Sequence, residues 1–390
     1  MHFNAFWESL TSNNRWQTLW CYLDEVDYHD KKLIYSDFFE KYMMKNMPCV
    51  IKNVAADWKS TSKWIDNNTI NYNHFIIEYG DLEAPVADCG SVVFNVHSKI
   101  NMTVSDYMHY LKNKSDKILY LKDWHLRKIK PIDDFYEVPL LFASDWLNEF
   151  AEDQQDDDYM FVYIGPKDSW TPLHADVFSS YSWSVNVIGR KKWILFPPGE
   201  ESKLRDKFGN LPMQYHEKVF NGVQYFEVIQ EKGDAIFVPS GWHHQVMNDL
   251  DTISINHNWI NGCNIETVWQ ALLFNLASVE NEIIEFKNTE DFESHCQLML
   301  KSMFGMDFKM FIRFIYHISK KRLEQLQSND YIKFGKATLG MKHIKFDLRV
   351  LSNMVRIISE HHLFTNQNVI PLPLQNDFMS LKHSLMTINV

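Results

Sequence analysis

The alternation of apolar and polar residues predicts a mixture of helices and strands over roughly the first 159 residues. Helical spacing of apolar residues predicts helices at 37–45 and 107–111, and runs of strand-forming residues predict strands at 49–54 and 118–121. Ser36 is the expected N-cap of the first helix, and Thr103 with Asp106 forms a capping-box pattern before the second. This part of the chain therefore favours an α/β arrangement.

From residue 160 to residue 259 the pattern changes to short strands separated by turn signals. The predicted strands are 160–164, 181–188, 193–196, 225–229, 235–238 and 252–259. Glycine and proline fill the breaks, as in Pro197-Pro198-Gly199 and Gly233-Asp234. Many short strands without long helices between them indicate an antiparallel barrel or sandwich.

Beyond Cys263 the spacing becomes helical again. The predicted helices are 265–286, 292–303, 308–326 and 344–361. We therefore expect an α+β protein with one domain over 1–262, whose core is about 160–262, and a separate helical region over 263–390. The acidic run 149–158 is expected to be a solvated surface loop.

Composition and charge narrow the possible partners. The 390 residues include 39 Lys and Arg against 50 Asp and Glu, a net charge of −11. We therefore expect no direct binding to nucleic acid and no attachment to an anionic membrane, and the charge favours a basic partner. The five cysteines form no CxxC pair, the start lacks a signal-peptide pattern, and no apolar run is long enough to span a bilayer. A cytoplasmic protein is expected, with the nucleus as the alternative compartment.

Three histidines and one aspartate provide the clearest chemical signal. His174 and Asp176 share one face if they lie in a strand, and a later strand on the opposite wall of a barrel would add a third ligand from His243-His244. Two imidazoles and one carboxylate leave positions open, as a non-haem Fe(II) site requires, whereas structural zinc usually has four ligands including thiolates. An HxD triplet and a surface histidine pair also occur without a metal. Here Asp176 lies between apolar neighbours, where a cation would compensate its burial.

Lys191 and Thr171 suggest a nearby site for an acid. Lys191 begins a predicted strand that would return beside the His174 strand, and a buried ammonium there needs a carboxylate partner. Thr171 precedes His174 by three residues and offers a hydroxyl donor. The alternative is a solvent-exposed basic turn at Gly189-Arg190-Lys191.

The ordered motifs resemble the jumonji C-type oxygenases. They read Tyr163-Ile-Gly-Pro, Thr171-Pro-Leu-His174-Ala-Asp176, Gly189-Arg-Lys191-Lys-Trp193 and Phe237-Val-Pro-Ser-Gly-Trp242-His-His244, and cover about residues 160–262. The resemblance implies a double-stranded β-helix, a cupin-like barrel, that binds Fe(II) and the cosubstrates 2-oxoglutarate and O2.

Carried over position by position, the resemblance implies a role for each residue that matches a family motif. It implies His174, Asp176 and His244 as metal ligands; His244 is preferred because relatives commonly have tryptophan where His243 stands. It implies Lys191 as the partner of the distal carboxylate of 2-oxoglutarate, with assistance from Thr171. Further cosubstrate contacts are expected among Tyr163, Ser184, Asn186, Asn256 and Asn258. Ser184 stands where many relatives have asparagine.

The resemblance also implies a reaction and a partner. One branch of the family hydroxylates a lysine carbon of the peptide-chain release factor, which implies a protein lysyl hydroxylase involved in translation termination. The alternatives are an N-methyl-lysine demethylase with the same site, a non-catalytic cupin-like interaction protein, and a zinc hydrolase that uses the same three ligands. The helical C-terminal region is expected either to form a homodimer or to support the mouth of the barrel.

Overall fold

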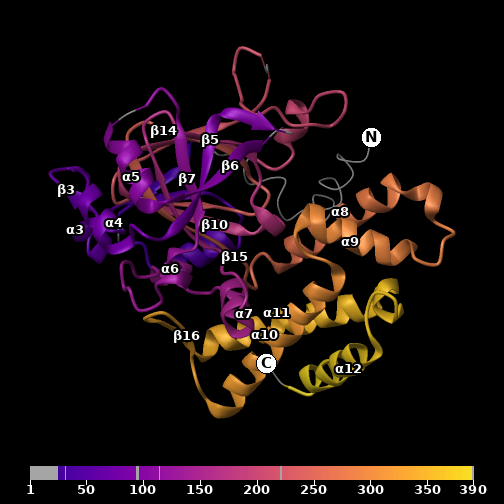
Figure 1. Cartoon of the computed structure of the whole chain (residues 1–390). Coiled ribbons are helices and arrows are strands. Elements are labelled where there is room, and N and C mark those ends of the chain that lie inside the picture. The colour runs from indigo at the N-terminus through magenta and orange to yellow at the C-terminus, as the bar shows by residue number, and fades with distance from the viewer. Residues whose placement is uncertain (1–24, 31, 94–95, 114, 220–221, 389–390) are drawn as a thin grey trace. The chain divides into compact units, whose positions relative to one another are not determined.

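The computed structural model describes residues 25–388, apart from 31, 94–95, 114 and 220–221. The start of the chain, where no signal peptide is predicted, lies outside the described residues. The chain divides into two compact units (Figure 1). Unit 1 comprises the described parts of Met1–Leu141, Asp157–Asp176 and Tyr181–Asn258, and unit 2 comprises those of Phe142–Asp156, Val177–Ser180 and Trp259–Val390.

Unit 1 is built on two sheets. The larger sheet has the order β1-β2-β13-β10-β15-β8-β7-β5-β6, and the smaller has the order β12-β11-β14-β9. Their strands are β1 Asp27–His29, β2 Cys49–Ile51, β5 Glu83–Val93, β6 Val96–Thr103, β7 Leu119–Trp124, β8 Met160–Gly165, β9 Trp170–His174, β10 Tyr181–Ile188, β11 Lys191–Phe196, β12 Phe226–Gln230, β13 Ala235–Val238, β14 His243–Asn248 and β15 Thr252–Trp259. Apart from β1 with β2, the described pairs with a stated register are antiparallel, which confirms the expected α+β class.

Apolar side chains from both sheets form one core. On β11, Lys191, Trp193 and Leu195 are buried and alternate with more exposed neighbours, as expected for a strand with one face turned inward. Trp193 and Leu195 pack in one cluster with residues of β2 and β13 from the larger sheet, including Val50 and Ile236. This core holds the smaller sheet against the larger one.

Shorter elements precede and connect the strands of unit 1. They are α2 Tyr35–Phe38, the π-helix η2 Phe39–Met43, α3 Lys59–Lys63, β3 Ile65–Asp66, β4 Thr69–Ile70, α4 Tyr72–Tyr79, α5 Val104–Asn113, α6 Leu126–Ile129 and the 3-10 helix η5 Glu200–Leu204. The predicted Ser36 cap is wrong, because the helix begins at Tyr35 after Ile34 and has no side-chain cap. The Thr103 capping interaction is confirmed: its hydroxyl accepts from Asp106 N at 3.1 Å.

Unit 2 is mainly helical and is drawn largely in orange to yellow in Figure 1. Its elements include α7 Trp146–Gln154, η4 Val177–Ser179, α8 Ile265–Glu282, η6 Ile284–Phe286, α9 Phe292–Phe304, α10 Phe308–Ser328, β16 Ile332–Phe334, β17 Ala337–Leu339, α11 Met341–Glu360, η7 His362–Thr365 and α12 Leu372–Met386. The four predicted helices are present, and α12 and the β16–β17 hairpin are additional. No helix within the described ranges is both long enough and apolar enough to cross a membrane.

A buried ion network joins three helices of unit 2. Arg322 of α10 is fully buried and donates to Glu149 of α7 and, through Nε at 2.7 Å, to Asp347 of α11. Trp146 Nε1 also donates to Asp347, at 3.0 Å. The expectation that 149–158 is a solvated loop is therefore wrong for its beginning, since 146–154 is helical and Glu149 is buried. One acidic residue of this run, Glu149, is the buried partner of the Arg322 guanidinium.

Replacing Arg322 by methionine is expected to destabilise the protein by about 3–5 kcal/mol, because it leaves Asp347 buried without its guanidinium partner and leaves Glu149 paired with Lys321 alone. Urea denaturation measures the change. Arg356→Met is the control: its exposed pair with Glu360 in α11 should contribute about 1 kcal/mol or less. Equal effects of the two substitutions would contradict a structural role for the network.

Candidate metal centre

His174, Asp176 and His244 converge in unit 1. One potential ligand atom from each lies within 4.8 Å of the other two. His174 ends β9 and is the direct cross-strand partner of His244 on β14. The prediction that the third ligand comes from the opposite wall is therefore wrong, because the two histidines occupy neighbouring strands of the same sheet. Asp176 lies two residues beyond the end of β9, in the following loop rather than in the strand.

Backbone carbonyls fix the orientation of both imidazoles. His174 Nδ1 lies 2.8 Å from the carbonyl oxygen of Pro172, and His244 Nδ1 lies 3.0 Å from that of Trp242. A carbonyl only accepts, so each Nδ1 carries the proton and each Nε2 keeps a lone pair for a metal. Burial, followed by the proximity of His244, lowers the pKa of His174. The ring is therefore neutral near pH 7, as metal binding requires.

Asp176 is oriented by a hydroxyl from the larger sheet. Ser182 of β10 donates to Asp176 Oδ2 at 2.6 Å, which leaves Oδ1 available. Hydrogen bonds of this kind fix ligand geometry around a metal. Two oriented imidazoles and one anchored carboxylate fit Fe(II) with open coordination positions, and no thiolate belongs to this cluster in the described residues.

The structure distinguishes His244 from His243. His244 belongs to the cluster. His243 does not, and its Nδ1 lies 3.8 Å from Oε2 of Glu201 in η5. Adjacent residues of a strand project to opposite faces, so one strand cannot present both histidines to one ion.

Lys191 is buried near the cluster, not exposed in a basic turn. Its ammonium donates to Ser254 of β15 at 2.6 Å. Burial, followed by repulsion from Lys122, lowers the pKa of Lys191 to about 7. The predicted pairing of its strand beside the His174 strand is wrong, because β14 lies between β11 and β9. The inward face of β11 nevertheless brings Lys191 into the space between the sheets.

Thr171 and Tyr163 lie close to the buried lysines. The Thr171 hydroxyl accepts from Lys122 Nζ at 3.2 Å. The Tyr163 hydroxyl donates to Asp123 at 2.6 Å, and the centre of its ring lies 5.7 Å from Lys191 Nζ. Since the Tyr163 proton already has an acceptor, the ring and not the hydroxyl is the part of this residue that faces the ammonium.

The side chains of the other predicted 2-oxoglutarate contacts differ in the hydrogen bonds that they make within the protein. Ser184 is buried and its hydroxyl has no partner in the described structure. Asn186 donates through its amide nitrogen to the Gln230 carbonyl at 2.8 Å. Asn256 donates to the Ser254 hydroxyl at 3.0 Å, which links it to Lys191. Asn258 is half-buried two residues further along β15.

Sequence reasoning missed two residues of β7. Tyr120 and Lys122 are both buried, and the Lys122 ammonium lies 5.6 Å from the centre of the Tyr120 ring. The predicted strand at 118–121 ended one residue before Lys122, whereas β7 extends to Trp124, and alternation along it puts residues 120 and 122 on one face. Which face it is depends on the pairing of β7 with β8, and the local pattern does not contain that information.

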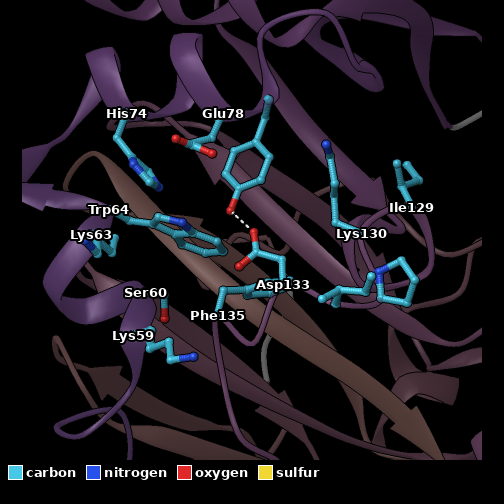
Figure 2. Close-up of a pocket in the computed structure, with 13 residues that line it drawn as sticks. Lys59, Ser60, Lys63, Trp64, His74, Glu78, Ile129, Lys130, Asp133 and Phe135 are labelled. Atoms are coloured by element: carbon cyan, nitrogen blue, oxygen red, sulfur yellow. Dashed lines mark hydrogen bonds between the residues drawn. The ribbon is translucent and has the colours of Figure 1, made fainter.

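Figure 2 shows a separate cavity of about 620 Å³ in unit 1. Residues of α3, α4 and the segment 129–135 line it, and the hydroxyl of one lining residue, Tyr79, donates to another, Asp133. None of the residues predicted to bind iron or 2-oxoglutarate lines this cavity. It is therefore distinct from the cluster of His174, Asp176 and His244.

Comparisons with known proteins agree with this chemistry. A family model described as a cupin-like domain matches residues 35–264, which include the whole cluster. The chain is 42% identical over 366 residues to a Drosophila melanogaster protein named 2-oxoglutarate and iron-dependent oxygenase JMJD4 homolog (84% of this chain, 86% of the relative). It is 40% identical over 347 residues to human JMJD4, with the same oxygenase name (84% and 83%). It is 39% identical over 326 residues to an Arabidopsis thaliana protein named arginine-specific demethylase JMJ20 (76% and 71%).

Separate alanine substitutions of the two adjacent histidines test the metal assignment. His244→Ala should weaken Mn(II) binding by more than about 100-fold, since even outer partners of metal ligands are worth about 10–100-fold. His243→Ala should leave it nearly unchanged. Isothermal titration calorimetry measures both, and the opposite ranking would show that His243 is the ligand.

Lys191→Met tests whether the buried ammonium lacks a counter-charge. Between pH 7 and pH 10.5 the unfolded chain binds a proton at Lys191 that the folded chain releases, so the free energy of unfolding rises with pH across this window. Without 2-oxoglutarate, the variant should be more stable than the wild type near pH 7, by at most about 5 kcal/mol. The advantage should shrink toward pH 10. Urea denaturation at several pH values measures it, and a difference independent of pH would contradict the explanation.

Proposed function

The chain belongs to the JMJD4 family of Fe(II)- and 2-oxoglutarate-dependent oxygenases, and from this premise we propose that it hydroxylates a lysine carbon of the peptide-chain release factor. The observation that carries the proposal is the convergence of His174, Asp176 and the buried His244 in the unit that also contains the buried lysine Lys191. The proposed encounter takes place in the cytoplasm, where a release factor acts on ribosomes.

Each residue of the site has a defined task in this proposal. His174, Asp176 and His244 would hold the iron, with Ser182 and two backbone carbonyls fixing their orientation. Lys191 would bind the distal carboxylate of 2-oxoglutarate, with Ser254 fixing the ammonium. When bound, iron and 2-oxoglutarate supply the oxidation of a C–H bond by dioxygen. The protein supplies the ligands and the orientation.

The charge of the chain supports a basic protein substrate. The net charge of −11 attracts positively charged segments such as those that carry lysine. The resemblance to the lysyl-hydroxylating branch supports the same residue type. The charge and the resemblance both support a substrate that contains lysine. The release factor itself is implied by the resemblance alone.

A second candidate reaction is demethylation of arginine. The relative that favours it is the Arabidopsis protein, whose name assigns it this activity, at 39% identity. Both reactions begin with oxidation of a C–H bond in a basic side chain and would use the same ligands. They differ in the outcome, since one adds oxygen to a lysine and the other removes a methyl group from an arginine.

Mass spectrometry of the release factor before and after loss of this protein from cells tests the proposal. We expect one lysine to lose the mass of an oxygen atom when the protein is absent. Restoring the wild type should return it, and restoring His174→Ala should not, because that variant lacks an iron ligand. An unchanged release factor would contradict the proposal, and a rise in methylarginine on cellular proteins would instead support the demethylase.

A further inference from the structure

Lys122 is a buried lysine beside the centre that the assigned cosubstrate contacts do not use. Its side chain projects from β7, and it is 9% exposed. The ammonium donates to the Thr171 hydroxyl at 3.2 Å. Thr171 lies on β9, three residues before His174, so Lys122 reaches the strand that carries the first ligand.

The neighbouring carboxylate does not neutralise this charge by direct contact. Asp123 Oδ2 accepts from Lys99 at 2.5 Å, and Oδ1 accepts from the Tyr163 hydroxyl at 2.6 Å. Within the described ranges, Lys122 takes part in no ion pair, and its hydrogen-bond partner, Thr171, is neutral. A buried ammonium with a neutral partner is unfavourable until an anion binds.

Lys191 is likewise a buried lysine whose ammonium has no carboxylate partner among the described residues. Its hydrogen-bond partner is the neutral Ser254 hydroxyl. The Tyr163 ring links the two lysines, with its centre 5.9 Å from Lys122 Nζ and 5.7 Å from Lys191 Nζ. After burial, the charge of Lys122 is the second cause of the lowered pKa of Lys191, so the two ammonium groups repel each other, and a single anion in contact with both would relieve this repulsion.

The hydroxyl of Thr171 is oriented by its hydrogen bond with Lys122. Its oxygen accepts from Lys122, so its own proton is free to point elsewhere. The Tyr163 proton, in contrast, is already donated to Asp123. Lys122 thus sets the Thr171 hydroxyl as a donor, and no acceptor for its proton is found among the described residues.

We propose that Lys122 and Lys191 together bind the distal carboxylate of 2-oxoglutarate, and that Lys122 also orients the Thr171 hydroxyl as a donor to it. This inference rests on the 2-oxoglutarate dependence of the family and not on the identity of the protein substrate. The pocket then carries two lysines where the resemblance assigns one. Its consequence is selectivity, because the second charge strengthens binding of dicarboxylates more than that of monocarboxylates.

Calorimetry on the Mn(II)-loaded full chain without dioxygen tests the inference. In Lys122→Met, the Kd for 2-oxoglutarate should rise at least about tenfold, equivalent to about 1.4 kcal/mol. The Kd for 2-oxopentanoate, which has the same chain length but no distal carboxylate, should change less than about twofold, as should the Kd for Mn(II). This selective loss is a readout that a merely structural role would not produce.

Two further variants provide the comparison. Lys192→Met removes an exposed lysine of β11 that pairs with Glu227, and it should leave the Kd for 2-oxoglutarate unchanged. Lys122→Arg keeps the charge and should retain more affinity than Lys122→Met. If Lys122→Met does not fold, Lys122→Gln replaces it in the same titrations.

Two outcomes would overturn the inference. One is an unchanged Kd for 2-oxoglutarate in Lys122→Met, and the other is an equal loss of affinity for both oxoacids. Because the titrations contain no protein substrate, they remain informative even if lysine hydroxylation is disproved.

Discussion

The antiparallel register of β9 and β14 is the constraint on which the metal centre depends. It sets His174 directly opposite His244, with the ring centres 4.4 Å apart. Cross-strand partners are the closest pairs that a sheet provides, so two ligands 70 positions apart in sequence reach one ion without a dedicated loop. A slip of one residue would turn His244 away and present His243 or Gln245 in its place. The irregularity between His244 and Val246 lies next to this pair, at the place where the ladder changes register.

The part of the site expected to bind 2-oxoglutarate depends on two lysines that are buried without a carboxylate partner. Lys191 and Lys122 lie among aromatic rings and hydroxyl groups, which stabilise an ammonium less than a carboxylate does. The Arg322 network of unit 2 is the opposite case, since each of its charges has a buried partner. A buried charge that is paired with an opposite charge of the protein has a structural role. A buried charge without such a partner can instead bind a ligand of opposite sign.

The sequence predicted local structure better than spatial relations. Alternation located β8, β10, β13 and β15, and helical spacing located α8 to α11, because both patterns are properties of consecutive residues. The Ser36 cap was wrong, since tertiary packing of the segment determines where the helix begins. The triad was identified from its residues, but the prediction put its third ligand on the wrong wall. Strand order depends on long-range pairing, and neither the place of β14 between β11 and β9 nor the face of Lys122 can be read from local periodicity.

The most direct test is diffraction at the iron absorption edge from crystals grown without dioxygen in the presence of Fe(II) and 2-oxoglutarate. The account predicts one anomalous peak bound by Nε2 of His174, Nε2 of His244 and a carboxylate oxygen of Asp176. It also predicts that the distal carboxylate of the cosubstrate contacts the ammonium of Lys191. An iron peak away from these three side chains, or a cosubstrate bound without contact to Lys191, would contradict it.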